Sequence, residues 1–367
     1  MLISQRSKET IDACRFCWMC RHLCPIGMAT GQERNTARAR ALTLSLVERG
    51  AAELADVIDN VYECALCGGC TNNCMTGWDP VQFTKETRLE AINNGVAPEY
   101  IMNLLDNIEA TGNAYGAKEL PAEIAELAKA CAEKTDTLLY LGTDTKYKNP
   151  AFAVDAATVL KKAGVAFTVL ADEPDSGAAL DFLAGEAGGT VEAAKKCAAA
   201  LAGFKTVIVL DPADAKMMKH EYKEWDIAPA AEIVTFTACA ASLIESGKLA
   251  VKKLPVPAAY QDAFALVRDL DECEEPRVIM NACTNLTEML LNRKVMIWGG
   301  NTLMAEYIPD VIKLVSKNRW ADAKHMNAKL LVVASPSEYV ALANVKPDDM
   351  ELMSLPELIL AAGNPRR

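Results

Sequence analysis

The spacing of apolar residues changes near residue 130 and divides the chain into two parts. In the first part apolar residues recur every three or four positions, as Ala37, Ala41, Leu44 and Val47 do. This period places them on one face of a helix. The sequence therefore predicts a mostly helical first part, with helices that run to a glycine over 33–50, 84–95 and 98–112.

Beyond residue 134, short apolar runs alternate with amphipathic stretches. The runs have the length of buried strands, and the stretches between them have helical spacing. We expect strands over 137–142, 165–170, 205–210, 294–299 and 328–335. Helices are expected over 149–164, 190–203, 214–222 and 305–320. Alternation of this kind indicates parallel sheets, with the second half of this part a weaker copy of the first.

Composition narrows the classes of function. The 367-residue chain has a net charge of −11 and no run of lysine or arginine, which argues against binding to nucleic acids or anionic membranes. No apolar stretch reaches the roughly 18 residues of a membrane-spanning helix, and the first residues lack the apolar core of a signal peptide. We therefore expect a cytoplasmic protein with no nucleic-acid partner and no transmembrane segment.

The thirteen cysteines fall into two populations. Eight form two runs with the same C-x2-C-x2-C-x3-C spacing: Cys14, Cys17, Cys20, Cys24 and Cys64, Cys67, Cys70, Cys74. The other five occur singly, as ordinary buried thiols do: Cys131, Cys197, Cys239, Cys273 and Cys283. A disulfide framework is not expected, because such frameworks belong to small secreted domains.

The spacing of the two runs is that of bacterial ferredoxins, in which the fourth cysteine of each run holds the other run's [4Fe–4S] cluster. We therefore assign one cluster to Cys14, Cys17, Cys20 and Cys74, and the other to Cys64, Cys67, Cys70 and Cys24. Zinc is the alternative metal, because sites of four cysteines also bind it. Zinc sites seldom repeat this spacing twice, so two [4Fe–4S] clusters are expected.

Other residues near the runs leave alternatives open. His22 could be a ligand or a proton relay, but four cysteines per cluster make an exposed or supporting position the better expectation. Trp18 and Trp78 could shield the clusters from water or could be core aromatics. Three arginines of the segment 33–50 could dock a partner, although a solvated helix face is favoured: Arg34, Arg38 and Arg40.

The helical part with its two cysteine runs resembles the alpha-helical ferredoxin domain of succinate dehydrogenase and heterodisulfide reductase iron–sulfur subunits. The layout of the whole chain is similar to the CCG-domain iron–sulfur oxidoreductase family. That family includes the glycolate oxidase iron–sulfur subunit, the C subunit of the anaerobic glycerol-3-phosphate dehydrogenase, LutA and the B and D subunits of heterodisulfide reductase. The repeat framework is visible in VLKKAGVAFTVLADE (159–173), KTVIVLDPAD (205–214) and AKLLVVASPSEY (328–339).

The resemblance implies an α + α/β fold. An alpha-helical ferredoxin domain with two [4Fe–4S] clusters would occupy residues 1–130. Two degenerate CCG-type α/β repeats would follow over 131–255 and 256–367.

The cysteines that bind clusters in this family are missing from both repeats. Their positions hold other side chains: Thr143, Asp175, Ser176, Asp211, Asp214, Ile297, Trp298, Ser335 and Glu338. Oxygen ligands are poor substitutes for thiolates, so we expect the repeats to bind no iron. Two further interpretations stay open. Asp175, Asp211, Asp214 and Glu338 could hold Mg²⁺ or Ca²⁺, or a small molecule could bind between the repeats.

The chain is expected to carry electrons without a complete active site of its own. It has no recognisable flavin or nicotinamide motif, so a partner must perform two-electron chemistry. The resemblance implies an FAD-containing dehydrogenase of the 2-hydroxy-acid or glycerol-phosphate type, which further electron-transfer subunits could join. The alternatives are a heterodisulfide-reductase-like subunit of a flavin-based electron-bifurcating complex, and an iron–sulfur scaffold or redox sensor without turnover.

Overall fold

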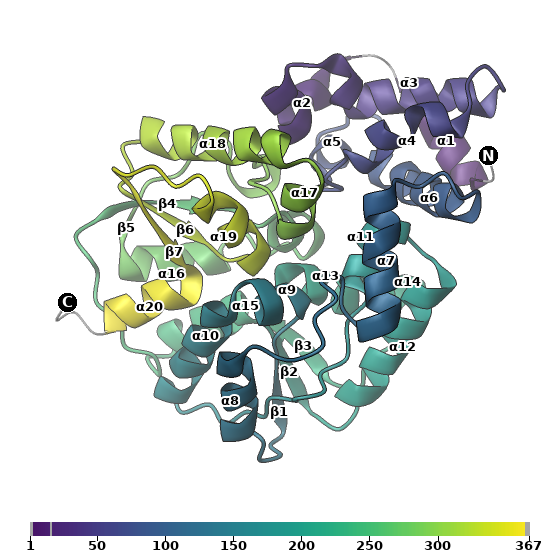
Figure 1. Cartoon of the computed structure of the whole chain (residues 1–367). Coiled ribbons are helices and arrows are strands. Elements are labelled where there is room, and N and C mark those ends of the chain that lie inside the picture. Colours follow the sequence, from purple (N-terminus) through teal and green to yellow (C-terminus); the bar gives the residue numbers. More distant parts are fainter. Residues whose placement is uncertain (1–2, 15–16, 364–367) are drawn as a thin grey trace.

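The computed structural model describes residues 3–14 and 17–363. Helices form the first part, and two parallel sheets with their own helices follow it (Figure 1). The prediction of helical and parallel α/β structure is therefore confirmed, whereas the domain limits stay predictions. No helix of the described ranges is both long enough and apolar enough to span a lipid bilayer.

Short helices build the first part: α1 (Gln5–Asp12), α2 (Pro25–Thr30), α3 (Ala37–Glu48), α4 (Leu54–Tyr62), α5 (Gly69–Asn72), α6 (Pro80–Asn93), α7 (Glu99–Thr111) and α8 (Ala122–Ala130). The helix expected over 33–50 begins later, because the Thr36 side chain caps the start of α3. The helices expected over 84–95 and 98–112 are α6 and α7. Their apolar faces meet around Leu44 and Phe83, which are fully buried.

The first sheet has the order β1 (Thr137–Tyr140), β2 (Thr206–Val209) and β3 (Glu232–Thr235), and all pairs are parallel. Its helices are α9 (Thr143–Lys148), α10 (Pro150–Lys162), α11 (Ala178–Ala184), α12 (Gly188–Leu201), α13 (Pro212–Lys216), α14 (Tyr222–Glu224) and α15 (Phe236–Glu245). A π-helical segment, Met217–Glu221, joins α13 to α14, so the helix expected over 214–222 is longer than predicted.

The prediction of a strand over 165–170 is wrong. Only Thr168 pairs with β1, through Leu139 N to Thr168 O and Thr168 N to Thr137 O, both at 2.9 Å. The flanking amides of β1 on this side donate to side chains instead: Thr137 N to Thr135 Oγ1 at 3.2 Å and Leu141 N to Glu173 Oε2 at 2.6 Å. A longer strand therefore has no free donors on β1 with which to pair.

The second sheet has the order β5 (Asn285–Leu286), β4 (Pro257–Gln261), β6 (Leu330–Val333) and β7 (Glu351–Ser354), again parallel. Its helices are α16 (Glu275–Cys283), α17 (Thr302–Tyr307), α18 (Pro309–His325), α19 (Pro336–Ala343) and α20 (Leu355–Gly363). The helix expected over 305–320 is divided between α17 and α18, because Pro309 cannot continue a helix and starts a new one.

The prediction of a strand over 294–299 is also wrong. Side chains, rather than a neighbouring strand, bind the carbonyl groups of this segment. Arg268 donates to Lys294 O at 2.9 Å and to Met296 O at 2.5 Å, and Gln261 donates to Ile297 O at 2.9 Å. The segment therefore lies across the end of β4, and Trp298 is buried there.

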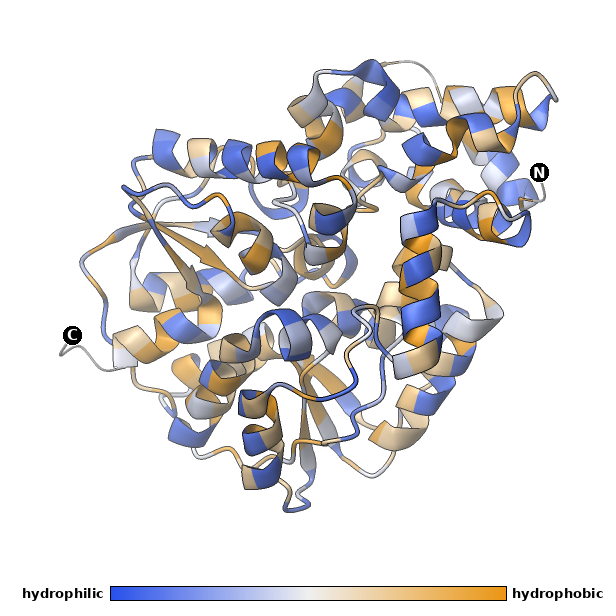
Figure 2. Cartoon of the chain, in the orientation of Figure 1, coloured by the Kyte–Doolittle hydropathy of each residue, from blue (hydrophilic) through white to orange (hydrophobic). Residues whose placement is uncertain are grey.

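The two sheets share one apolar core. The cluster that contains Leu139 and Ile208 of the first sheet also contains Tyr260 and Val332 of the second. Helices between the sheets connect them, with α10 against α20 and α15 against α16 (Figure 1). Figure 2 shows apolar residues concentrated in the strands and on the inner faces of these helices.

Arg88 connects the helical part to the first sheet's helices. Its side chain is fully buried and donates to Cys64 O at 2.6 Å and Phe182 O at 2.5 Å. Phe182 lies on α11, and the Tyr62 hydroxyl donates to the next carbonyl there, of Leu183, at 3.2 Å. Because buried carbonyl groups need donors, this guanidinium holds segments that lie far apart in the sequence.

Replacing Arg88 with methionine should lower the free energy of unfolding by about 3 kcal/mol, because several buried carbonyls would lose their donor. Urea unfolding of the full chain measures this. Arg49→Met is the matched control, since Arg49 is exposed and makes one distant ion pair with Asp12, and it should change stability by less than about 0.5 kcal/mol. Equal effects of the two substitutions would contradict the role of Arg88.

Candidate metal centres and an adjoining acidic cavity

Two cavities in the helical part are lined by the clustered cysteines. The first cavity, about 160 Å³, is lined by Cys14, Cys17, Cys20 and Cys74. The second cavity is narrower, about 20 Å³, and is lined by Cys24, Cys64, Cys67 and Cys70. Cys70 also lines the first cavity, so the two are neighbours. Each cavity combines three cysteines of one run with the fourth cysteine of the other, although which cysteines bind which cluster stays a prediction.

The two runs have the same local backbone shape at one position. Trp18 and Gly68 each follow the second cysteine of their run, and both have a φ of 69°. Glycine adopts this left-handed conformation freely, whereas in other residues it costs roughly 1 kcal/mol or more. The guanidinium of Arg38 lies 3.6 Å from the centre of the Trp18 ring, so this contact offsets part of the cost.

The thiols of each set lie within electrostatic range of one another. Burial, together with charges on Cys14 and Cys17, raises the pKa of Cys20. Burial raises the pKa of Cys24 to about 11, an effect that Arg40 opposes. Burial, with charges on neighbouring thiols, raises the pKa of Cys70 well above its ordinary value. These thiols need a bound cation to become thiolates, and metal binding supplies it.

Backbone amides and a hydroxyl reach several of these sulfurs. Gly27 N donates to Cys24 Sγ at 3.4 Å, and the Gly69 amide bonds to Cys67. Burial acts to raise the pKa of Cys74, but hydrogen bonds from Thr76, whose Oγ1 lies 3.2 Å from the sulfur, outweigh it and lower that pKa. All thirteen cysteines are free thiols. Hydrogen bonds to ligand sulfurs are typical of iron–sulfur sites, so both donor sets fit [4Fe–4S] clusters.

Both expectations for Arg40, a docking residue or part of a solvated face, are wrong. Its side chain is 2% exposed, lines the second cavity and donates to Asn60 O at 2.9 Å and Asn35 O at 2.8 Å. The second cysteine run folds against this face of α3, which the spacing of a single helix could not reveal. Arg34 is exposed and pairs with Glu63 at 2.8 Å.

The other residues that the sequence singled out near the cysteine runs have varied positions. His22 is exposed, as expected. Trp78 lines the first cavity and is also a buried core residue beside Phe83, whereas Trp18 is 44% exposed. None of the five single cysteines is exposed, and none lines either cavity: Cys131, Cys197, Cys239, Cys273 and Cys283.

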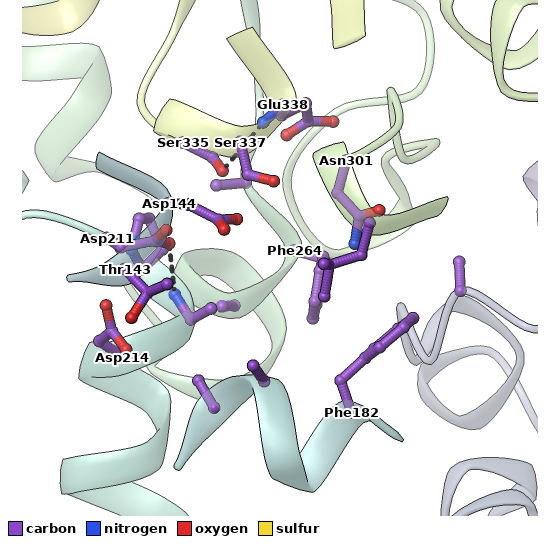
Figure 3. Close-up of a pocket in the computed structure, with 18 of the residues that line it drawn as sticks. Thr143, Asp144, Phe182, Asp211, Asp214, Phe264, Asn301, Ser335, Ser337 and Glu338 are labelled. Carbon is purple, nitrogen blue, oxygen red and sulfur yellow. Dashed lines mark hydrogen bonds between the residues drawn. The ribbon is translucent and has the colours of Figure 1, made fainter. Parts of the chain in front are cut away.

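A third cavity of about 120 Å³, here called the acidic cavity, is lined by residues that follow β1, β2, β4 and β6 (Figure 3). Its polar wall includes Thr143, Asp144, Asp211, Asp214, Ser337 and Glu338. Its apolar wall includes Phe182, Phe264 and Trp298. Ala65 lines both this cavity and the second cysteine cavity, so the two adjoin.

Most of the positions at which the resemblance implied replaced cysteines meet at the acidic cavity. Those that line it are Thr143, Asp175, Asp211, Asp214, Trp298, Ser335 and Glu338. The other two lie behind the wall, where Ser176 donates to Asp214 and the carbonyl of Ile297 accepts from Gln261. Sequence reasoning missed Asp144, Asn301 and Ser337. The position of Asp144, just after the predicted strand 137–142, was the available signal.

Hydrogen bonds fix the acidic side chains from several elements. Tyr115 donates to Asp144, and Thr143 donates to Asp175 at 2.5 Å. Glu338 Oε1 accepts from Gly299 N at 2.5 Å and from Gln261 Nε2 at 3.0 Å. Gly142 must be a glycine here, because a Cβ would lie 2.0 Å from Asp214 Oδ2.

Burial keeps these acids protonated at higher pH than usual. It raises the pKa of Asp211 to about 7, with a contribution from the charge of Asp144. It raises the pKa of Glu338 to about 8, against the opposing hydrogen bonds from Gly299 and Gln261. The pKa of Asp214 is raised well above its ordinary value by burial and by Asp211. Part of the polar wall is therefore uncharged near neutral pH.

Within the described ranges, no three His, Cys, Asp or Glu side chains converge as ligands of a single metal ion. The geometry thus gives no support to Mg²⁺ or Ca²⁺ on Asp175, Asp211, Asp214 and Glu338. The thiols are not placed around one zinc ion either. In a cubane each thiolate binds a different iron, so its ligands lie farther apart than those of one ion.

Comparison with known proteins agrees with the cysteine geometry. Residues 10–78 match the 4Fe-4S dicluster domain family. The chain is 26% identical to the D subunit of the dihydromethanophenazine:CoB–CoM heterodisulfide reductase from Methanosarcina acetivorans, over 89% of this chain and 87% of that protein. It is 23% identical to the corresponding D subunit from Methanosarcina barkeri, with the same coverage. An uncharacterized iron–sulfur protein of Methanocaldococcus jannaschii is 21% identical, over 90% of this chain and 67% of that protein.

The fold also has a solved counterpart. A hypothetical protein from Helicobacter pylori aligns with a TM-score of 0.59 and 12% identity, over 100% of this chain and 74% of that one. The chain thus contains a 4Fe-4S dicluster domain, is an iron–sulfur protein and has the D subunit of heterodisulfide reductase among its homologues.

Glu338→Gln should flatten the pH dependence of stability. A carboxyl group whose pKa is raised on folding contributes stability below its unfolded pKa, and this is lost as pH rises through the folded value of about 8. Between pH 6 and pH 8 the unchanged protein should therefore lose about 2 kcal/mol more than Glu338→Gln. Urea unfolding at both pH values measures this. Glu192→Gln on the exposed face of α12 should behave as the unchanged protein, and parallel curves for all three would contradict the prediction.

Proposed function

We propose that the chain is the electron-transfer subunit of a multisubunit oxidoreductase and carries two [4Fe–4S] clusters. One cluster is held by Cys14, Cys17, Cys20 and Cys74, and the other by Cys24, Cys64, Cys67 and Cys70. Such clusters pass single electrons. The observation that carries the proposal is that two neighbouring cavities, lined by five and by four cysteines, share Cys70 and together contain all eight.

The surroundings of the two cavities suggest that electrons pass through them between the surface and the interior of the protein. Exposed apolar side chains border the first cavity, with Met75 87% exposed and Trp18 and Met19 each 44% exposed. The second cavity lies deeper and adjoins the acidic cavity through Ala65. We infer that the first cavity faces the partner from which electrons arrive or to which they leave.

The residues around the second cavity hold it rigid and bring positive charge to it. Arg40 lines the cavity, and Arg268 donates to Cys67 O at 2.5 Å. Fixed cations and amide donors favour the reduced, more negative state of a bound cluster. A Cβ at Gly69 would lie 3.2 Å from Arg268 Nη2, so a larger residue there would crowd this guanidinium.

The proposed partner is an FAD-containing dehydrogenase of the 2-hydroxy-acid or glycerol-phosphate type. The resemblance to the CCG-domain family and the absence of a recognisable nucleotide-binding motif support this. In this proposal the two α/β repeats, 131–255 and 256–367, bind no iron and form the scaffold that supports the cluster loops. The cytoplasm is the proposed location.

The second candidate is a heterodisulfide-reductase-like subunit of a flavin-based electron-bifurcating complex. The similarity to the D subunit of heterodisulfide reductase over 89% of the chain favours it. The polar and apolar side chains at the positions of the missing family cysteines weigh against disulfide chemistry at the acidic cavity, because they cannot hold the clusters that perform it in the family.

Anaerobically purified chain should contain about eight irons as two cubanes. Cys74→Ser should perturb the EPR signal of one cluster and leave the other cluster more intact, because only one cavity loses a ligand. Cys273→Ser, at a single cysteine that lines neither cavity, should leave both signals unchanged. Zinc in place of iron would refute the proposal. Loss of the cluster bound by Cys64, Cys67 and Cys70 in Cys74→Ser would refute the crossed assignment.

The isolated, flavin-free chain should not be reduced by an organic substrate. The clusters should be reduced within seconds when a co-purified flavoprotein and its substrate are added, because only the flavin accepts the electron pair. Anaerobic absorbance of the clusters near 400 nm measures this, on the order of a halved extinction upon reduction. Reduction of the isolated chain by lactate, glycolate or glycerol 3-phosphate would contradict the assignment of the chemistry to a partner.

A further inference from the structure

The acidic cavity has an acceptor group for which the chain supplies no donor. Asp211 is 4% exposed, and its Oδ1 accepts from Ala213 N at 2.9 Å. Among residues 3–14 and 17–363 no further donor contacts this carboxyl group, whose side chain lines the cavity. A carboxylate oxygen that faces a cavity without a donor can accept a charge-assisted hydrogen bond from a ligand.

The charged residues around the cavity determine whether it favours a cationic or an anionic ligand. Asp144, Asp175, Asp214 and Glu338 join Asp211 in the wall, and no lysine, arginine or histidine of the described ranges lines it. Lys146 is the nearby cation of α9, but it is paired with Glu173 at 3.1 Å. An anionic molecule would find no cationic partner, whereas a cation would find carboxyl oxygens as acceptors, because a carboxyl group keeps an acceptor oxygen even when it is protonated.

The opposite wall fits the apolar part of such a molecule. Figure 3 shows Asp144 and Asp211 on one side, with Phe264, Asn301 and Phe182 across from them. Phe182, Phe264 and Trp298 line the cavity, and aromatic faces attract organic cations. The volume of about 120 Å³ is somewhat below that of an engineered cavity of about 150 Å³ that holds benzene. A ligand of about six non-hydrogen atoms therefore fits.

We propose that the acidic cavity is a binding site for a small organic cation, a protonated amine with a short aliphatic chain. Its ammonium group donates to Asp211 beside Asp144, and its chain lies against Phe182, Phe264 and Trp298. The site goes beyond electron transfer and does not require it, because no cysteine takes part. Its occupant would sit beside the second cysteine cavity, with Ala65 between them.

The test uses three probes of similar length and different charge: 1,4-diaminobutane, 1,4-butanediol and succinate. Isothermal titration calorimetry is performed anaerobically on the full chain with its clusters, at pH 8, where Asp211 is mostly ionised. The diamine should bind at least about tenfold more tightly than the diol, because charge-assisted hydrogen bonds are the stronger ones, and succinate should not bind. Equal binding of diamine and diol, or preference for succinate, would overturn the proposal.

Three variants distinguish binding in the cavity from binding to acidic residues on the surface. Asp211→Asn keeps the acceptor for Ala213 N and removes the charge, so diamine binding should weaken by about tenfold or more. Ala179→Leu fills the cavity while it leaves every carboxyl group in place, and it should abolish binding. Asp310→Asn, whose side chain is 94% exposed, should bind as the unchanged protein. If Asp211→Asn fails to fold, Ala179→Leu decides alone. Retained binding in Ala179→Leu, or equal weakening in Asp310→Asn, would show surface binding and overturn the proposal.

Discussion

The second cysteine loop depends on arginine side chains that bind its carbonyl groups. Arg40, Arg88 and Arg268 come from three different elements, and together they donate to the carbonyls of Asn60, Val61 and Tyr62 in the last turn of α4 and of Cys64 and Cys67 in the loop. The last carbonyls of a helix, and those of a loop that presents thiols inward, have no partners within a regular helix. The guanidinium groups supply the missing donors, and they bring positive charge to a place where thiolates and iron would otherwise gather net negative charge.

The positively charged region around the second cysteine cavity lies directly beside the acidic cavity. Ala65 has the second cysteine cavity on one side and the acidic cavity on the other. Across that short distance the fixed groups change from guanidinium to carboxyl. A charge that enters one cavity therefore alters the electrostatic potential in the other, because charges interact more strongly across a protein interior than across water. The second cysteine cavity and the acidic cavity are thus electrostatically coupled.

Features that depend only on neighbouring residues could be predicted from the sequence. The spacing of the two cysteine runs is enough to indicate a metal centre, and the apolar runs of β1, β2 and β6 indicate buried strands. The segments 165–170 and 294–299 have the same apolar character, yet side chains take the hydrogen bonds that strands there would need: Thr135 and Glu173 beside the first, Arg268 and Gln261 at the second. Such competition from side chains is not visible in the local apolar pattern. The candidate sites show the same division, because the eight cysteines were predicted as ligands from spacing, whereas the burial of Arg40 and the inclusion of Asp144 in the acidic cavity follow from contacts across the fold.

The long reach of Arg268 has a consequence for how the protein is made. Arg268 lies 201 positions after Cys67, whose carbonyl it binds, and Lys294, whose carbonyl accepts from Asn72, lies 222 positions after that residue. While the ribosome is still synthesising the second sheet, the loop around Cys67 lacks these contacts. These contacts can form only after residues 268 and 294 have been synthesised. A chain terminated before them therefore lacks the contacts that hold the loop around Cys67.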